Sequence, residues 1–150
     1  MSGKSTFDEA PDAQSIDKAR QIFIEGISNP VFEIFDKTHT GFSYYYLYEL
    51  RGKKLYLIAK TFAIDGNSGD DITIANKHYD RSFELKPIYK DLNGDGFTDI
   101  ELAGNISMDD IYDKHTHKEV KARKILLYDR RLKKFREDLN RRIGFLKTDY

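Results

Sequence analysis

Hydrophobic and polar residues alternate along several segments of the chain, and this period of two is typical of β-strands with one buried face. In the clearest segment, 42–50, one face carries Phe42, Tyr44, Tyr46, Tyr48 and Leu50. Arg51-Gly-Lys-Lys54 follows as a hairpin turn, and residues 55–62 return with the strand pattern. Together with a strand expected over 31–35 and a loop over 36–41, these segments predict an antiparallel meander.

The strand pattern continues toward the C-terminus in further pieces. They cover residues 72–75, 76–89, 100–102 and 124–137, the last as a hairpin with its turn at 129–133. Pro87 favours an edge position, because proline cannot donate to a strand ladder. We therefore predict a mainly β fold with minor helix, in which the meander forms a β-sandwich or a curled sheet.

Three segments show helical spacing of their apolar residues instead. Residues 16–27 predict a short helix or turn that feeds a strand, although the end of this segment could itself be a strand. Asn29-Pro30 is expected to interrupt the chain after it. A helical turn is predicted at 108–113, and a short basic helix is predicted over 139–146.

The length of 150 residues suits one domain with a real hydrophobic core. Residues 1–15 are small, polar and acidic, which predicts a flexible N-terminal arm before a single β-rich domain over 16–150. The chain has no cysteine, so neither disulfides nor thiolate chemistry are expected. No apolar run approaches the roughly 20 residues of a membrane-spanning helix.

Charge and aromatic content narrow the choice of partners. Lys+Arg and Asp+Glu are both 25, so the net charge of zero gives no global attraction to nucleic acid or to a membrane. The stretch 118–142 is rich in Lys and Arg, but its interleaved acids favour a solvated face over a basic binding patch. The aromatic row over 42–50 is expected in the core, the alternative being a platform for stacked ligands.

An acidic, glycine-containing loop carries the strongest chemical signal. It places side-chain oxygens at loop positions 1, 3, 5 and 9, from Asp91, Asn93, Asp95 and Asp99. Gly94 and Gly96 allow a tight wrap that would also turn the carbonyl of Phe97 inward. Ca²⁺ requires several hard oxygen ligands on a flexible loop, whereas Mg²⁺ prefers strict octahedral geometry with retained waters. We predict a Ca²⁺ site made by these five residues, the alternative being a solvated turn.

The loop departs from an EF-hand. An EF-hand needs a bidentate Glu at its twelfth position and flanking helices. Here the twelfth position is Leu102, and Pro87 opposes an entering helix. The surroundings predict a strand, the loop and a second strand.

The stretch D-L-N-G-D-G-F-T-D-I resembles the D-x-[DN]-x-D-G-x-x-D-[IL] loops of FG-GAP repeats and of bacterial extracytoplasmic β-proteins. The resemblance covers about ten residues and implies bound Ca²⁺, with Asp99 as the closing carboxylate. A single copy does not support a propeller. The better resemblance is to small single-domain β-proteins, some of which look like periplasmic lysozyme inhibitors.

Other candidate sites are weaker. Residues 65–71 are acidic, but their Asp and Asn do not fall at loop positions 1, 3, 5 and 9, so we expect an exposed loop. His115 and His117 could pair on a metal, although an exposed loop is favoured because no third ligand is spaced nearby. The chain contains no nucleophile elbow, P-loop, Rossmann fingerprint or zinc-protease helix.

These patterns predict a non-enzymatic calcium-binding β-domain that acts as a protein-binding or inhibitor module, with a wall-degrading enzyme as the candidate partner. The resemblance implies a periplasmic or secreted location. Residues 1–6 lack the apolar segment of a signal peptide, so that location would require a leader that is removed. Two alternatives stay open: a structural calcium module of a surface assembly, and an enzyme whose polar pocket lies away from residues 91–99.

Overall fold

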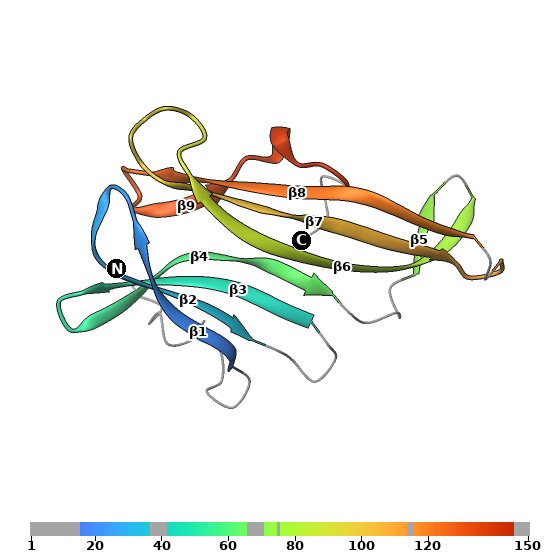
Figure 1. Cartoon of the computed structure of the whole chain (residues 1–150), viewed down its shortest axis with the longest axis horizontal. Helices are drawn as coiled ribbons and strands as arrows, with labels where there is room; N and C mark the ends of the chain where they lie inside the picture. Colours follow the sequence, from blue (N-terminus) through green and yellow to red (C-terminus); the bar gives the residue numbers. More distant parts are fainter. Residues whose placement is uncertain (1–15, 37–41, 66–70, 75, 114–115, 146–150) are drawn as a thin grey trace.

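The computed structural model describes residues 16–36, 42–65, 71–74, 76–113 and 116–145. These residues form one antiparallel sheet of order β1-β2-β3-β4-β6-β7-β8-β9, with β5 paired to β6 off this path (Figure 1). The strands are β1 (Ile16–Ile24), β2 (Ile27–Asp36), β3 (Phe42–Arg51), β4 (Lys54–Asp65), β5 (Asp71–Ile74), β6 (Lys77–Lys90), β7 (Asp99–Asp110), β8 (His117–Asp129) and β9 (Lys134–Glu137). The predicted antiparallel meander is therefore confirmed.

The sheet curls so that its two halves, β1–β4 and β6–β9, share one core. Only two residue pairs, Ile64 with Glu84 and Asp65 with Phe83, join β4 to β6. Buried side chains from both halves form a single cluster that includes Tyr45, Leu47 and Ile58 from the first half and Leu85, Leu102 and Leu126 from the second. The sheet is continuous and does not close, so it is curled rather than a sandwich of two separate sheets.

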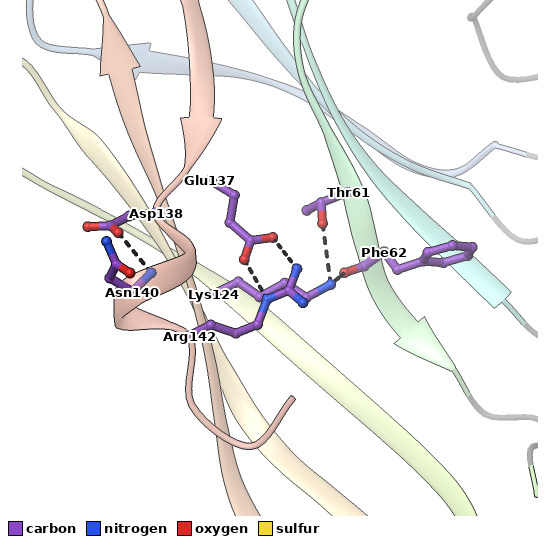
Figure 2. A network of polar contacts seen from close by, with 7 residues as sticks. All are labelled: Thr61, Phe62, Lys124, Glu137, Asp138, Asn140 and Arg142. Atoms are coloured by element: carbon purple, nitrogen blue, oxygen red, sulfur yellow. Dashed lines mark hydrogen bonds and ion pairs between the residues drawn. The ribbon is translucent and has the colours of Figure 1, made fainter. Parts of the chain in front are cut away.

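A buried lysine links the two halves. Lys124 of β8 is fully buried, and its Nζ donates to the carbonyl oxygen of Phe62 at 3.3 Å and to Thr61 Oγ1 at 3.4 Å, both on β4 (Figure 2). Beside it, the guanidinium of Arg142 donates to both carboxylate oxygens of Glu137, at 2.6 and 2.8 Å. These bonds satisfy the fully buried Lys124 and the mostly buried Arg142.

Gly104 lies where the sheet bends. It pairs with Leu85, next to the point at which β6 also meets β4. A Cβ at this position would overlap the carbonyl oxygen of Glu84 and lie 3.0 Å from its carbonyl carbon. Glycine in a strand often marks such a close approach of two backbones. The close approach of β6 and β7 at this point therefore requires glycine.

Two prolines lie inside strands. Beyond Glu84, β6 pairs with β7 alone, so Pro87 occupies a locally unpaired edge as predicted. Pro30 lies within β2 and does not interrupt it, contrary to prediction. The pairing with β1 is irregular between Ile22 and Ile24, opposite this segment, and such an irregularity accommodates a residue without an N–H.

The predicted helices are the main error. Residues 16–24 form β1, whose pairing with β2 overrides the helical spacing of its apolar residues. Residues 108–110 continue β7 in place of a helical turn. In the C-terminal segment the only helix among the described residues is the 3₁₀ turn η3 (Leu139–Arg141), after which Ile143 bridges to Arg123. The N-terminal arm 1–15 lies outside the described residues.

Candidate metal centre

The acidic loop joins β6 to β7 at one end of the molecule. Figure 1 shows the β1–β2 turn, the β3–β4 turn and the β8–β9 turn at the same end. A meander places alternate connections at the same end of its strands, so segments distant in sequence meet around residues 91–98. The acidic loop therefore lies beside three connections that are distant from it in the sequence.

The loop brings three carboxylates together. Oxygens of Asp91, Asp95 and Asp99 lie within 4.8 Å of one another. Gly94 and Gly96 adopt φ of 75° and 84°, the left-handed region that glycine enters without steric cost. Their amides donate to Asp91 at 2.8 and 2.9 Å, so the wrap of the loop orients the first carboxylate.

The other two predicted ligands, Asn93 and the carbonyl of Phe97, lie in the same loop. The side-chain oxygen of Asn93 accepts a hydrogen bond from the amide of Asp95 at 3.3 Å. The amide of Phe97 donates to Asp95 Oδ1 at 2.9 Å. Both contacts stabilise the turn that presents the three carboxylates.

Asp99 is the buried member of the cluster, with no exposed surface. Its Oδ2 accepts the amide of Leu92 at 3.0 Å, and its Oδ1 accepts the amide of Tyr128 at 3.0 Å. One carboxylate therefore ties the loop to β8. Charge-assisted bonds of this kind are stronger than neutral ones.

Asp91 and Asp95 are exposed at the mouth of the cluster. The amide of Gly96, followed by those of Gly94 and Asn93, holds the pKa of Asp91 below its usual value. Asp91 thus stays ionised at neutral pH. Hard, anionic oxygens that are partly open to solvent fit a hard divalent cation better than a soft transition metal.

Two hydrogen bonds, one between backbones and one from a backbone amide to a side chain, join the loop to the β1–β2 turn. The amide of Thr98 donates to the carbonyl oxygen of Glu25 at 3.0 Å, and the amide of Glu25 donates to Thr98 Oγ1 at 3.1 Å. A Cβ at Gly26 would overlap the ring of Phe97, which stacks on Tyr128 at 5.5 Å between centroids. Sequence reasoning missed the roles of Thr98 and Gly26, because no local pattern links positions so far apart in the chain.

The weaker candidates do not form a metal cluster within the described part of the chain. His117 begins β8, and its Nδ1 lies 2.6 Å from Asp109 Oδ1. This hydrogen bond raises the pKa of His117, and the protonated ring forms an ion pair with Asp109. His115 and residues 66–70 lie outside the described residues, and Asp65 and Asp71 lie at the ends of β4 and β5.

A second polar constellation lines a cavity of about 550 Å³ between β1, β2 and β6. The carboxylate of Glu33, only 5% exposed, accepts the Nε of Arg20 at 2.8 Å and the hydroxyl of Tyr89. The hydroxyls of Tyr45 and Tyr89 are 2.7 Å apart. Burial, followed by the bond to Glu33, raises the pKa of Tyr89 far above its usual range, so its phenol stays protonated.

We expect Tyr89→Phe to lower the free energy of unfolding by about 1–3 kcal/mol, because the buried carboxylate loses a donor. A tyrosine whose pKa is raised on folding stabilises the fold below pH 10, and that stability is lost as the pH rises through the folded pKa. Urea unfolding should therefore show the difference at neutral pH and a smaller one at strongly alkaline pH.

Tyr56→Phe is the matched control, since no hydrogen bond of the Tyr56 hydroxyl is found among the described residues, although its ring lies 4.5 Å from the guanidinium carbon of Arg51. Equal destabilisation by the two variants would contradict a specific role of the Tyr89 hydroxyl.

No helix among the described residues is both long and apolar enough to cross a membrane. Comparison of the chain with protein-family models, with curated proteins and with solved structures finds no match. The chain is thus characterised by its curled antiparallel sheet and its three-aspartate cluster.

Proposed function

We propose that the chain is a calcium-binding β-domain in which the ion stabilises the loop end of the sheet and that end contacts a protein partner. The observation that carries the proposal is the approach of three carboxylates, from Asp91, Asp95 and Asp99, to within 4.8 Å of one another. Like charges at that distance repel, and a divalent cation converts the repulsion into attraction.

The donor set supports Ca²⁺ over Mg²⁺. Carboxylates from Asp91, Asp95 and Asp99 supply three hard oxygen donors, and the side chain of Asn93 and the carbonyl of Phe97 would complete the set. Ca²⁺ accepts six to eight oxygens in flexible geometry, whereas Mg²⁺ dehydrates reluctantly and demands an octahedron. A loop with two exposed members also leaves room for water ligands.

The position of the loop supports a structural role. Residues 91–99 contact β8 through Asp99 and contact the β1–β2 turn through Thr98. An ion that fixes the loop would therefore stabilise the approach of both halves of the sheet. Binding to the folded state alone raises stability by mass action.

The test is thermal unfolding in about 5 mM CaCl₂ and in EGTA, with MgCl₂ as the control ion. We expect Ca²⁺ to raise the free energy of unfolding by about 1–2 kcal/mol, since that concentration is roughly 5 to 50 times the Kd of a weak extracellular site. The melting temperature should rise by about 2–8 °C. Asp95→Ala should abolish this rise.

Asp109→Ala provides the control, because Asp109 is also exposed but lies on β7 away from the loop, paired with His117. It should keep the Ca²⁺-induced rise. An unchanged rise in Asp95→Ala, or an equal response to Mg²⁺, would contradict the assignment.

The resemblance of the loop to extracytoplasmic β-proteins supports a periplasmic or secreted location, where millimolar Ca²⁺ would saturate a weak site. A sheet that carries the acidic loop and three further connections at one end suits a binding or inhibitor module, with a wall-degrading enzyme as the candidate partner. Inhibition assays against lysozyme-type enzymes, with and without Ca²⁺, test that choice. An absence of inhibition in both conditions would count against it.

The cavity beside Glu33 favours the second candidate, an enzyme or small-molecule-binding protein, because it gathers polar residues away from the acidic loop. Its groups are already satisfied by one another, since Glu33 accepts from both Arg20 and Tyr89. A phenol with a raised pKa is a poor general base at neutral pH. The binding module therefore remains the leading proposal.

A further inference from the structure

Two basic hairpins meet beside the acidic loop. The β3–β4 turn carries Lys53 and Lys54, and Arg51 at its start donates from Nη2 to the carbonyl oxygen of Lys133 in the β8–β9 turn, at 3.1 Å. This bond joins segments 82 residues apart. The combined surface, here named the basic patch, consists of Lys53, Lys54, Arg130, Arg131, Lys133 and Lys134, all exposed.

The neighbouring acids are already engaged. Asp129 accepts the amides of Arg131 and Leu132 and pairs with Arg136. Glu137 pairs with Arg142, and Asp138 pairs with Arg141. Glu49, at the base of the other hairpin, pairs with Arg51. The carboxylates of the two hairpins therefore pair with arginines outside the basic patch.

The cations of the patch lack such partners. Across the described residues, no carboxylate forms an ion pair with Lys53, Lys54, Arg131, Lys133 or Lys134. The guanidinium of Arg130 lies over the ring of Phe97, 4.9 Å from its centroid, next to the acidic loop. A groove of about 500 Å³ runs from Asn93 of that loop to the arginines of the hairpin. The six cations of the basic patch thus gather at this end of the molecule, beside the exposed carboxylates of Asp91 and Asp95.

An apolar side chain stands in the middle of these cations. Leu132 lies at the tip of the β8–β9 turn and is 50% exposed, with Arg131 before it and Lys133 after it. Cations attract the phosphates of an anionic lipid surface, while an exposed apolar side chain gains from entering the boundary between headgroups and acyl chains. An acidic protein would satisfy the cations without requiring an exposed leucine at the tip.

We propose that the basic patch docks the domain onto an anionic lipid surface, with Leu132 inserted among the headgroups. The attraction is electrostatic and falls off within a Debye length, about 8 Å at physiological salt. The basic patch attracts the anionic lipid surface even when no Ca²⁺ is bound to the acidic loop. Where the loop binds Ca²⁺, as proposed above, the added positive charge near Phe97 and Arg130 strengthens the attraction.

Cosedimentation with vesicles tests the proposal. The probes are vesicles of phosphatidylcholine alone and vesicles with roughly 30% phosphatidylglycerol, in about 0.1 M salt with EGTA. We expect binding to the anionic vesicles only. Substituting Lys53→Gln, Lys54→Gln and Lys134→Gln together should lower the partition coefficient on the order of 100-fold, since each cation near the surface contributes about fivefold. Leu132→Ser alone should also weaken vesicle binding, but it should not change how steeply binding depends on salt concentration.

The matched control removes three equally exposed lysines from other parts of the sheet: Lys18, Lys77 and Lys121, each changed to Gln. Both triple variants have the same net charge, so only the location of the charge differs. The control should retain binding within about twofold, because distant surface charges are screened. Repeating the series with Ca²⁺ should raise the affinity of the wild-type protein.

Equal losses in the two triple variants, equal binding to neutral vesicles, or no binding to anionic vesicles would each overturn the proposal. Capture by polyglutamate without vesicle binding would assign the patch to an acidic protein instead. Failure of Ca²⁺ to raise the melting temperature would overturn the calcium proposal and leave lipid docking in EGTA intact. If a variant fails to fold, binding of the wild-type protein to anionic vesicles is measured at increasing salt concentration. Binding that does not fall with salt would exclude electrostatic docking.

Discussion

Replacing Asp99 with alanine is expected to lower the free energy of unfolding by about 2–4 kcal/mol even in EGTA. The carboxylate has no exposed surface, and it accepts the amides of Leu92 and Tyr128. Its removal leaves two part-buried donors without their acceptor and leaves a void behind β8. Urea unfolding by circular dichroism measures the change, with EGTA present so that the ion contributes nothing.

Asp95→Ala separates the two roles of the loop. Asp95 is exposed, so its loss should cost less than about 1 kcal/mol in EGTA while removing the response to Ca²⁺. Asp99→Asn should fall between wild type and alanine, because a carboxamide keeps one acceptor oxygen. Equal stability of wild type and Asp99→Ala in EGTA would contradict the structural role of the buried carboxylate.

Gly104→Ala is expected to destabilise the protein by about 3 kcal/mol or more, since overpacking against backbone cannot be relieved by a rotamer change. The new methyl group would overlap the carbonyl of Glu84 at the bend where β6 leaves β4. We expect a lower urea midpoint and less folded protein on expression.

Gly52→Ala is the comparison for this variant. Gly52 adopts φ of 62°, and a Cβ there meets no atom within 4 Å. The cost should be only the strain of a left-handed residue, about 1 kcal/mol. A cost for Gly104→Ala no greater than that for Gly52→Ala would show that the two backbones do not approach as closely as described.

Sequence patterns correctly predicted the features that depend on residues close together in the chain. The alternation over residues 42–62 led directly to β3 and β4, and the loop spacing led to the cluster of Asp91, Asp95 and Asp99. Each of these two patterns spans fewer than about 25 residues, so it can be recognised from residues that are close together in the sequence. Helix was wrongly predicted for 16–27, because β1 is an edge strand with seven exposed residues, and its apolar spacing follows no buried face.

The rest of the site depends on contacts that no short window contains. Thr98 meets Glu25 across 73 residues, and Tyr89 meets Glu33 across 56. The basic patch likewise arises only when two separate hairpins meet through Arg51. The interleaved acids of residues 118–142 predicted a neutral surface. In the structure these acids pair with other residues, and the lysines of the basic patch are exposed to solvent.

The short junction between β4 and β6 has a consequence for the order of folding. Each half of the sheet is a meander of consecutive strands, so its contacts close short loops and form with little loss of chain entropy. The contacts between halves, such as Tyr45 with Tyr89 and Lys124 with Phe62, close loops of 44 and 62 residues. We therefore infer that the hairpins form first and that docking of the halves is the slow step. The bonds of Thr98 to Glu25 and of the buried Lys124 to β4 are then made only as the protein reaches its native state.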